Sequence, residues 1–321
     1  MSGQMTEAKT DALTDERRID VMTLGETMAV VAPARPEPLE MAADFILGTA
    51  GAESNVAQYL AERGHKVAWA SRVGDDALGR RLANELAGRG IDLSYLLIDP
   101  DSSTGVMFKD PGTGATKVQY YRANSAASLM GSELADTLPW HQLGLLHLSG
   151  ITPALSPSCR AMMQALFSRA AQENVPVSFD INFREALWPA SVAAPVLLKL
   201  AQQADFLFVG LDEAQALWPN LVFASDVRAL IDRPKHLIVK DGAVGATEYD
   251  GLQLTFVPAA RVDVVEAVGA GDAFAAGYLS SMLDGGRPTQ RLGRGHEFAG
   301  RALRSISDFQ AMNGTVANNG Q

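Results

Sequence analysis

Between residues 145 and 240 the chain alternates short apolar strands with helices, and this alternation limits the folds it can adopt. Parallel strands need crossovers of a dozen residues or more, which helices usually supply. The intervals therefore predict an α/β fold with a mostly parallel sheet. The expected strands are Leu145–Leu148, Val175–Asp180, Phe206–Val209 and His236–Lys240, and the expected helices are Ser156–Glu173, Val192–Gln203 and a short one after Asp212.

Short strands dominate before residue 125 and do not fit simple βαβ winding. Helices are expected at Ser54–Arg63 and Ala77–Arg89, each followed by a glycine that can end it. Two more helices are expected to close the chain, at Ala270–Leu283 and about Gln290–Ile306. The expected early strands are Ile19–Val31 with a break at Gly25, Leu39–Leu47, Val67–Val73, Ser94–Ile98, Gly105–Lys109 and Lys117–Tyr121, with a turn at Pro111–Gly114.

The composition limits the kinds of molecule that this chain can bind and the compartment in which it is expected. The chain has 321 residues, of which 47% are hydrophobic, so it can bury a sizeable core. Its net charge of −10 argues against nucleic acid or an anionic membrane as the main partner. The single cysteine, Cys159, favours a reducing compartment, so a cytoplasmic location is expected. The polar stretches Met1–Arg18 and Asn313–Gln321 are expected to be disordered tails around a folded domain at 19–312.

Gly269-Ala270-Gly271-Asp272 opens a helix of small residues. Free N–H groups at a helix start bind anions, and glycines let a phosphate approach the backbone closely. Asp272 places a carboxylate in that anion site, where its charge would repel a phosphate. A base beside a phosphate cradle is what phosphoryl transfer to a hydroxyl requires. The structural alternative is an aspartate that caps the helix.

Asn55 lies just inside a strand-to-helix junction, where ligands of α/β sheets bind. Gly51 and Ala52 allow a close backbone approach, and an asparagine can both donate to and accept from sugar hydroxyls. An ordinary glycine turn is the alternative.

Tyr120 and Arg122 are two residues apart on an expected strand, so both side chains point to one face. A phenol beside a guanidinium suits a sugar acid, which offers hydroxyls and a carboxylate. A solvated strand edge would give the same pattern.

Asp180, Asn182 and Arg184 follow a buried strand at alternating spacing, a position more typical of a site than of a core. Arg184 is the best candidate for a charge partner of a carboxylate or phosphate. A local salt bridge, for example with Glu185, is the alternative.

These segments resemble the ribokinase-like (PfkB) family of carbohydrate kinases, and within it the 2-keto-3-deoxygluconate kinases. The resemblance runs in family order from about residue 20 to about 312. It rests on Ala50–Ala57 with Gly64 and Gly74, Val118–Ser128, Phe179–Trp188, Val239–Gly242 with Gly245, and Gly269–Asp272.

The resemblance implies a ribokinase-like central sheet flanked by helices, with a small β-sheet lid over the sugar, a common dimer contact. Lid strands would fall within about 31–48 and 94–122. ATP would bind at Lys240, Gly242, Gly245 and the Gly269–Asp272 loop, with Mg²⁺ and, as an open option, a monovalent cation. The resemblance implies Asp272 as base, aided by Gly269, Ala270 and Gly271, and a substrate site of Gly51, Ala52, Asn55, Tyr120, Arg122, Asn182 and Arg184.

Four positions depart from the family pattern. Ala50 replaces a glycine, which is a mild change. Met107 stands where the ketodeoxygluconate branch commonly has a substrate-contacting tyrosine, which puts the exact sugar in doubt. Gly210 replaces an asparagine that organises Mg²⁺ together with an acid. That acid is retained here as Glu213, acting through water, and a helix cap at Asp212 is the structural alternative for this stretch. Glu266 keeps a carboxylate before the glycine motif where the family has aspartate.

We therefore expect an ATP-dependent kinase acting on a primary hydroxyl, with 2-keto-3-deoxygluconate as the best candidate substrate. A fructokinase or ribokinase acting on a neutral sugar is the alternative within the same class. A catalytically silent sugar-binding regulator is the alternative outside it; Asp272 argues against this reading, and Gly210 leaves it open.

Overall fold

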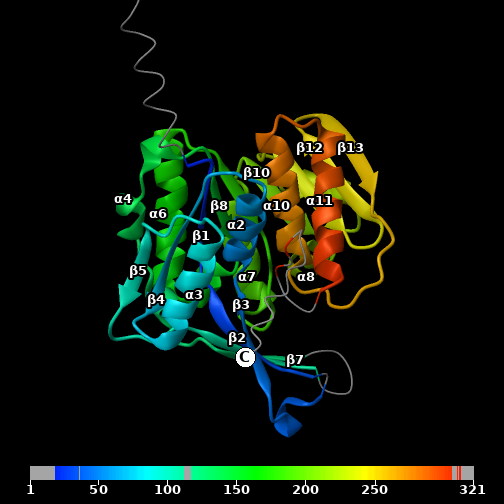
Figure 1. Cartoon of the computed structure of the whole chain (residues 1–321). Helices are drawn as coiled ribbons and strands as arrows, with labels where there is room; N and C mark the ends of the chain where they lie inside the picture. The colour runs from blue at the N-terminus through cyan, green and yellow to red at the C-terminus, as the bar shows by residue number, and fades with distance from the viewer. Residues whose placement is uncertain (1–18, 36, 112–116, 306–308, 310, 312–321) are drawn as a thin grey trace, which may run out of the picture.

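The structure is a computed structural model that describes residues 19–35, 37–111, 117–305, 309 and 311. Both expected tails, and most of the turn expected at Pro111–Gly114, lie outside these residues. Within them, nine strands form one sheet through the middle of the molecule (Figure 1). From edge to edge they are β13 (Gln253–Pro258), β12 (Gly245–Asp250), β11 (His236–Asp241), β10 (Phe206–Gly210), β9 (Val177–Asp180), β8 (Leu146–Ser149), β1 (Val21–Leu24), β4 (Val67–Gly74) and β5 (Leu96–Asp99).

The strands from β5 to β11 are parallel, and β12 and β13 are added antiparallel at one edge. This confirms the mostly parallel sheet. The β12–β13 hairpin was not anticipated, although Asp250-Gly251 between two strand-like segments is a common hairpin signal. All seven parallel strands present their carboxyl ends at the same edge, which is where ligands of such sheets bind.

Helices cover both faces of the sheet (Figure 1). One face carries α2 (Ala52–Glu62), α3 (Ala77–Gly88), α10 (Ala270–Leu283) and α11 (Pro288–Leu303). The other carries α4 (Leu134–Thr137), α5 (Thr152–Leu155), α6 (Pro157–Glu173), α7 (Ala190–Ala201), α8 (Leu211–Leu217) and α9 (Ala224–Leu230), with 3₁₀ turns at Ala126–Leu129 and Trp140–Gln142.

The two cores follow from the alternation of side chains along each strand. In β10, Leu207 and Val209 pack under the α6–α9 layer, whereas Phe208 faces α10. In β11, Ile238 lies on the same face as Phe208. Because the strands are buried on both faces, they are continuously apolar in sequence, as is usual for parallel sheets.

A separate four-stranded sheet lies below the main body in Figure 1. Its strands are β3 (Phe45–Ala50), β2 (Met28–Pro33), β6 (Val106–Asp110) and β7 (Lys117–Tyr121), in that order. We call this sheet the lid.

Two sequence expectations about the strands need correction. The segment expected as a strand at Leu39–Leu47 begins as a 3₁₀ turn at Leu39–Met41, and β3 starts only at Phe45, after the Ala34 N–H bonds the Asp44 carbonyl. The strand expected at Ser94–Ile98 lies at the edge of the large sheet, as β5 beside β4, and not in the lid.

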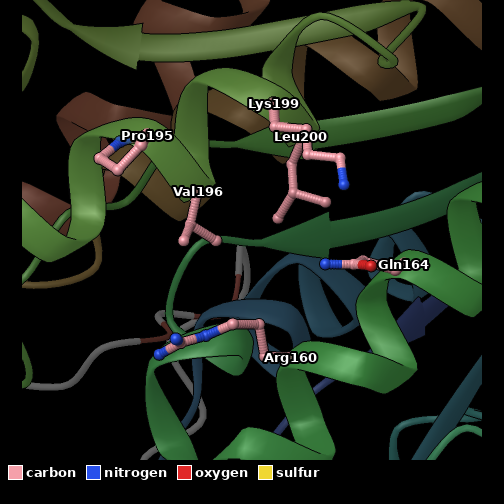
Figure 2. A pocket seen from close by; sticks show the side chains of 6 residues that line it. All are labelled: Arg160, Gln164, Pro195, Val196, Lys199 and Leu200. Atoms are coloured by element: carbon pink, nitrogen blue, oxygen red, sulfur yellow. The ribbon is translucent and has the colours of Figure 1, made fainter.

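A small groove of about 140 Å³ lies between α6 and α7 (Figure 2). Pro195 lies inside α7 and has no N–H to donate to the carbonyl four residues earlier. Arg160 and Gln164 of α6 form the opposite wall. None of the residues that line this groove lines the larger cavity described below.

None of the helices in the described part of the chain combines the length and the apolar character that a membrane-spanning helix needs.

Candidate active site

A cavity of about 1420 Å³ opens at the carboxyl ends of β9, β10 and β11. The inner face of the lid forms one wall, and the start of α10 lies at its base. A loop at residues 259–268 and one side of α11 form the far wall. From the lid come Met107, Lys109, Val118 and Tyr120; from the strand ends Asp180, Asn182, Arg184, Asp212, Glu213 and Lys240; and from the α10 side Gly269, Ala270, Gly271 and Asp272.

Asp272 is held by two asparagines that come from distant parts of the chain. Asn55, in the first turn of α2, donates from Nδ2 to Asp272 Oδ2 at 2.9 Å. Asn182, just after β9, donates from Nδ2 to Asp272 Oδ1 at 3.1 Å. Each carboxylate oxygen therefore has one amide donor, which fixes the plane of the carboxylate while it lines the cavity.

The environment of Asp272 sets its proton affinity close to neutrality. Its side chain is only 7% exposed. Burial raises the pKa of Asp272 to about 7, against the Asn55 hydrogen bond and the Arg184 charge, which lower it. A carboxylate with such a pKa is a competent general base at neutral pH.

Lys240, at the end of β11, pairs with Asp180 at the end of β9. Its Nζ lies 2.9 Å from Asp180 Oδ2 and 3.3 Å from Oδ1. Burial alone would lower the pKa of Lys240, but the carboxylates of Asp180 and Glu213 outweigh it and raise that pKa. The position of a Cβ on Gly271 would be 3.4 Å from Lys240 Nζ. The cation therefore lies directly beside the glycine loop.

The first turn of α10 has the geometry of an anion cradle. Gly269 adopts φ 80°, in the left-handed region that favours glycine, and the helix begins at Ala270. The Ala273 N–H makes the first helical bond, to the Gly269 carbonyl. N–H groups in such a first turn have no carbonyl partner within the helix, so they and the Lys240 cation suit a phosphate.

Residues 18–309 match the pfkB family of carbohydrate kinases. The chain belongs to this family. It is 32% identical over 300 residues to a 2-dehydro-3-deoxygluconokinase from Bacillus subtilis (strain 168), covering 92% of this chain and 93% of that one. It is 32% identical over 275 residues to a 2-dehydro-3-deoxygalactonokinase from Haloferax volcanii, covering 83% and 85%.

A solved structure supports the same assignment. The crystal structure of a PfkB protein from Polaromonas sp. JS666 superposes with a TM-score of 0.83 at 35% identity, covering 90% of this chain and 98% of that one. The resemblance drawn from the sequence, the ribokinase-like fold and the activity of an ATP-dependent carbohydrate kinase are thus confirmed. A kinase of this family uses ATP and Mg²⁺.

In this kinase, the part of the cavity next to the residues expected to bind ATP extends further than the sequence had indicated. Gly242 and Gly245 lie at the turn between β11 and β12, both with positive φ, as expected for a tight approach. Beyond them the cavity continues between the 259–268 loop and α11, where His296 and Gly300 form part of the wall. No sequence signal indicated that α11 lines the cavity, because small residues such as Ala299 and Gly300 are common on any packed helix.

The structure differs from the sequence expectation at Arg122. This residue does not line the cavity but pairs with Glu26, which is buried and also accepts from Ser125 Oγ at 2.6 Å. Its guanidinium lies 5.6 Å from the ring centroid of Tyr120, which does line the cavity. Glu26 was missed, although it follows the glycine that separates β1 from β2.

The remaining expected residues divide into two groups. Arg184 and Asn182 line the cavity, and the Arg184 side chain is exposed there. Gly51 and Ala52 lie at the start of α2 and are not part of the cavity lining; Asn55 reaches the site through Asp272.

Carboxylates near the strand ends suit Mg²⁺, which prefers oxygen ligands. Asp180, Asp212 and Glu213 line the cavity near the carboxyl ends of β9 and β10. One oxygen of Glu213 accepts from the Gly210 N–H at 2.8 Å, so this acid also caps α8. Burial raises the pKa of Glu213, and a nearby cation would favour its ionised form.

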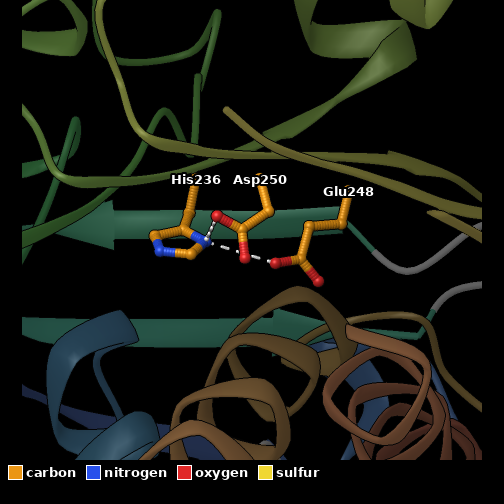
Figure 3. A group of neighbouring side chains, drawn as sticks. All are labelled: His236, Glu248 and Asp250. Atoms are coloured by element: carbon orange, nitrogen blue, oxygen red, sulfur yellow. Dashed lines mark hydrogen bonds and ion pairs between the residues drawn. The ribbon is translucent and has the colours of Figure 1, made fainter. Parts of the chain in front are cut away.

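A second polar cluster lies away from the cavity, between the strands β11 and β12 and the helices α10 and α11 (Figure 3). His236, Glu248 and Asp250 have ligand atoms within 4.8 Å of one another. Arg291 pairs with both acids, and Tyr278 donates to Glu248 Oε1 at 2.6 Å. Because the guanidinium already offsets the acids, we interpret the cluster as a structural network that joins α10 and α11 to the sheet.

Proposed function

We propose that this kinase transfers the γ-phosphoryl group of ATP to a primary hydroxyl of a six-carbon sugar acid, with 2-keto-3-deoxygluconate as the leading candidate. The observation that carries the proposal is Asp272, a buried carboxylate with a pKa of about 7 that lines the cavity in the first turn of α10. The names of the two relatives support the substrate class.

In the proposed reaction Asp272 accepts the proton of the attacking hydroxyl. A bond forms between that oxygen and the γ-phosphorus, and the bond from the γ-phosphorus to the β–γ bridging oxygen breaks, so that ADP leaves. Amides of Ala270, Gly271 and Asp272, together with Lys240, stabilise the charge on the phosphate oxygens. Mg²⁺ held near Asp180, Asp212 and Glu213 would supply further positive charge to the phosphates.

The acid's carboxylate is proposed to bind Arg184, which is exposed in the cavity and has room for a ligand. Arg122 contributes less charge than we expected, because Glu26 offsets it. This same observation favours the second candidate, a neutral hexose or pentose. Met107 in the lid cannot hydrogen-bond a hydroxyl as a tyrosine there would, which bears on which acid fits best.

The deciding experiment compares kcat/KM for 2-keto-3-deoxygluconate, 2-keto-3-deoxygalactonate, gluconate, fructose and ribose, with Mg²⁺ and with either K⁺ or Na⁺ present. A thermal-shift panel of the same compounds reports binding without turnover. A sugar acid as best substrate supports the proposal. Fructose or ribose as best substrate replaces it with the second candidate, and binding without any ATP turnover points to a silent regulator.

The lid is proposed to form a homodimer contact. Its edge strand β3 exposes Phe45, Ile46 and Leu47 at 46%, 46% and 44%. A row of apolar side chains on an unpaired strand edge is a common site of association. Light scattering on the wild type and on Ile46→Lys checks this: a dimer that dissociates in the variant is expected, and a wild-type monomer contradicts it.

A further inference from the structure

An ion pair joins the lid to the loop that precedes α10. Lys109 Nζ, on β6, lies 3.1 Å from Oε1 and 3.2 Å from Oε2 of Glu266. The two residues are 157 positions apart in the chain. Their side chains are only 8% and 15% exposed, so water screens the pair weakly. Lys109 lines the cavity, so the pair ties the lid wall of the cavity to the loop that leads into α10.

The two partners are anchored differently. The backbone at Glu266 is fixed to the main body, because the N–H groups of Val265 and Glu266 both reach the Leu303 carbonyl at the end of α11, at 2.7 and 3.3 Å. Lys109 belongs to the lid, on the same strand face as Met107, and both line the cavity. A movement of the lid would therefore carry the lysine away from a stationary carboxylate.

Separating Lys109 from Glu266 would leave a negative charge close to the start of α10. Glu266 lies three residues before Gly269, and the two residues between them, Ala267 and Val268, line the cavity. An uncompensated negative charge there repels a triphosphate. With Lys109 in place the charge is neutralised, and the low exposure of the pair makes that neutralisation effective.

We propose that Lys109 and Glu266 are positioning residues that couple the position of the lid to nucleotide affinity. With the lid down, Lys109 neutralises Glu266 and the cradle accepts ATP. With the lid raised, Glu266 repels it. Coupling between two ligands is reciprocal, so an acceptor that holds the lid down tightens ATP binding, and ATP tightens the acceptor by the same factor. This last step rests on the proposed acceptor site beneath the lid.

The test measures binding of Mg²⁺ and the non-hydrolysable analogue AMP-PNP to the full chain by calorimetry, without sugar. Lys109→Met should weaken binding on the order of 5- to 150-fold, the usual range for coupled sites. Glu266→Gln alone should bind at least as tightly as the wild type. The double variant Lys109→Met/Glu266→Gln carries no uncovered carboxylate and should regain most of the lost affinity.

The control is Lys117→Met, which removes an exposed lysine from the neighbouring lid strand β7 and should leave AMP-PNP affinity unchanged. Wild-type affinity in Lys109→Met overturns the inference. Equal weakness of the double variant overturns it as well, because the lysine would then act through direct phosphate contact or packing.

A second arm repeats the titration with saturating 2-keto-3-deoxygluconate. The sugar should tighten AMP-PNP binding in the wild type and much less in Glu266→Gln. Equal tightening in both proteins contradicts the coupling. Failure of the proposed function is distinguishable, because it would leave 2-keto-3-deoxygluconate unphosphorylated by the wild type while the sugar-free binding results remain as stated.

Discussion

Asn182 donates to Asp272 Oδ1 at 3.1 Å from a backbone in the left-handed region, with φ 39°. Few residues other than glycine adopt this conformation, and asparagine is among those that tolerate it. The backbone N–H of Asn182 also donates to Asp180 Oδ1, at 3.2 Å. The backbone thus adopts an uncommon geometry just after β9, where the Asn182 side chain bonds Asp272, and such geometry is typical of functional sites.

The role of Asp272 is tested by Asp272→Asn, which keeps the volume and removes the base. Loss of a general base should lower kcat by about 10²- to 10⁴-fold. Acceptor and ATP affinity should stay near the wild-type values in calorimetry. Asp232→Asn, an exposed change, is the control. Near-normal turnover in Asp272→Asn would assign the base elsewhere.

The pH profile follows from the raised pKa of Asp272. The base must be ionised to accept a proton, so kcat/KM should rise with pH through about 7 and then level off. The Asn55 hydrogen bond favours the ionised form, and its removal in Asn55→Ala should move the acidic limb to higher pH. The exposed change Asn84→Ala should leave the limb in place. An unshifted or downshifted limb in Asn55→Ala would contradict the assignment.

Arg184 and Arg122 are expected to differ when each is replaced by alanine. A charge-assisted contact contributes about 1.5–3 kcal/mol, so Arg184→Ala should weaken a sugar acid on the order of 10- to 150-fold and a neutral sugar little. Arg122→Ala leaves buried Glu26 without its cation and should also destabilise the fold by about 3–5 kcal/mol.

Steady-state kinetics and urea unfolding separate the two effects. Arg233→Ala, at an exposed position, is the control for both. Equal losses for acid and neutral sugars in Arg184→Ala would exclude a carboxylate contact at this residue.

The anion cradle is tested by Gly271→Val. A Cβ at this position would meet Lys240 Nζ at 3.4 Å, an ordinary contact with the end of a flexible side chain, so the fold should tolerate the change. The added methyl groups should obstruct the phosphate, lowering ATP affinity while acceptor binding in thermal shift is kept. Gly88→Val, where a Cβ meets open space, is the control. Unchanged ATP binding in calorimetry would count against the cradle.

The network behind α10 is tested by Glu248→Ala. Removing this fully buried acid leaves Arg291 with a weaker partner, Asp250, and leaves the Tyr278 hydroxyl without its acceptor. Loss of one partner of a buried pair typically costs about 3–5 kcal/mol. Glu297→Ala, an exposed change on the same helix as Arg291, should cost far less. Similar urea midpoints for the two variants would show that the network is not important for stability.

Sequence reasoning worked best where a local pattern has a single structural meaning. The apolar runs of β8 to β11 predicted the parallel sheet, and the glycines before Asp272 predicted the start of α10. It worked less well for side-chain partners. Asn55 was expected to contact a sugar directly, and its bond to a carboxylate 217 residues away cannot be read from spacing.

Charge compensation was harder still to predict from the sequence. Arg122 was interpreted as a cation that faces the sugar. Its partner, Glu26, lies 96 positions earlier in the chain, before the first lid strand. Likewise, Lys109 had no distinguishing neighbours in sequence. Long-range ion pairs depend on how the sheets are placed relative to each other, and that placement follows from packing rather than from any local motif.

The origin of the three residues at the base has a consequence for how activity appears during folding. Asn55, Asn182 and Asp272 come from the first, middle and last parts of the described chain. Contacts between such distant segments form late, because the chain loses the entropy of closing a long loop before the contacts can stabilise it. A nascent or truncated chain that ends before α10 lacks the carboxylate altogether. Recovery of activity on refolding should therefore lag behind recovery of secondary structure, which makes turnover a reporter of complete assembly.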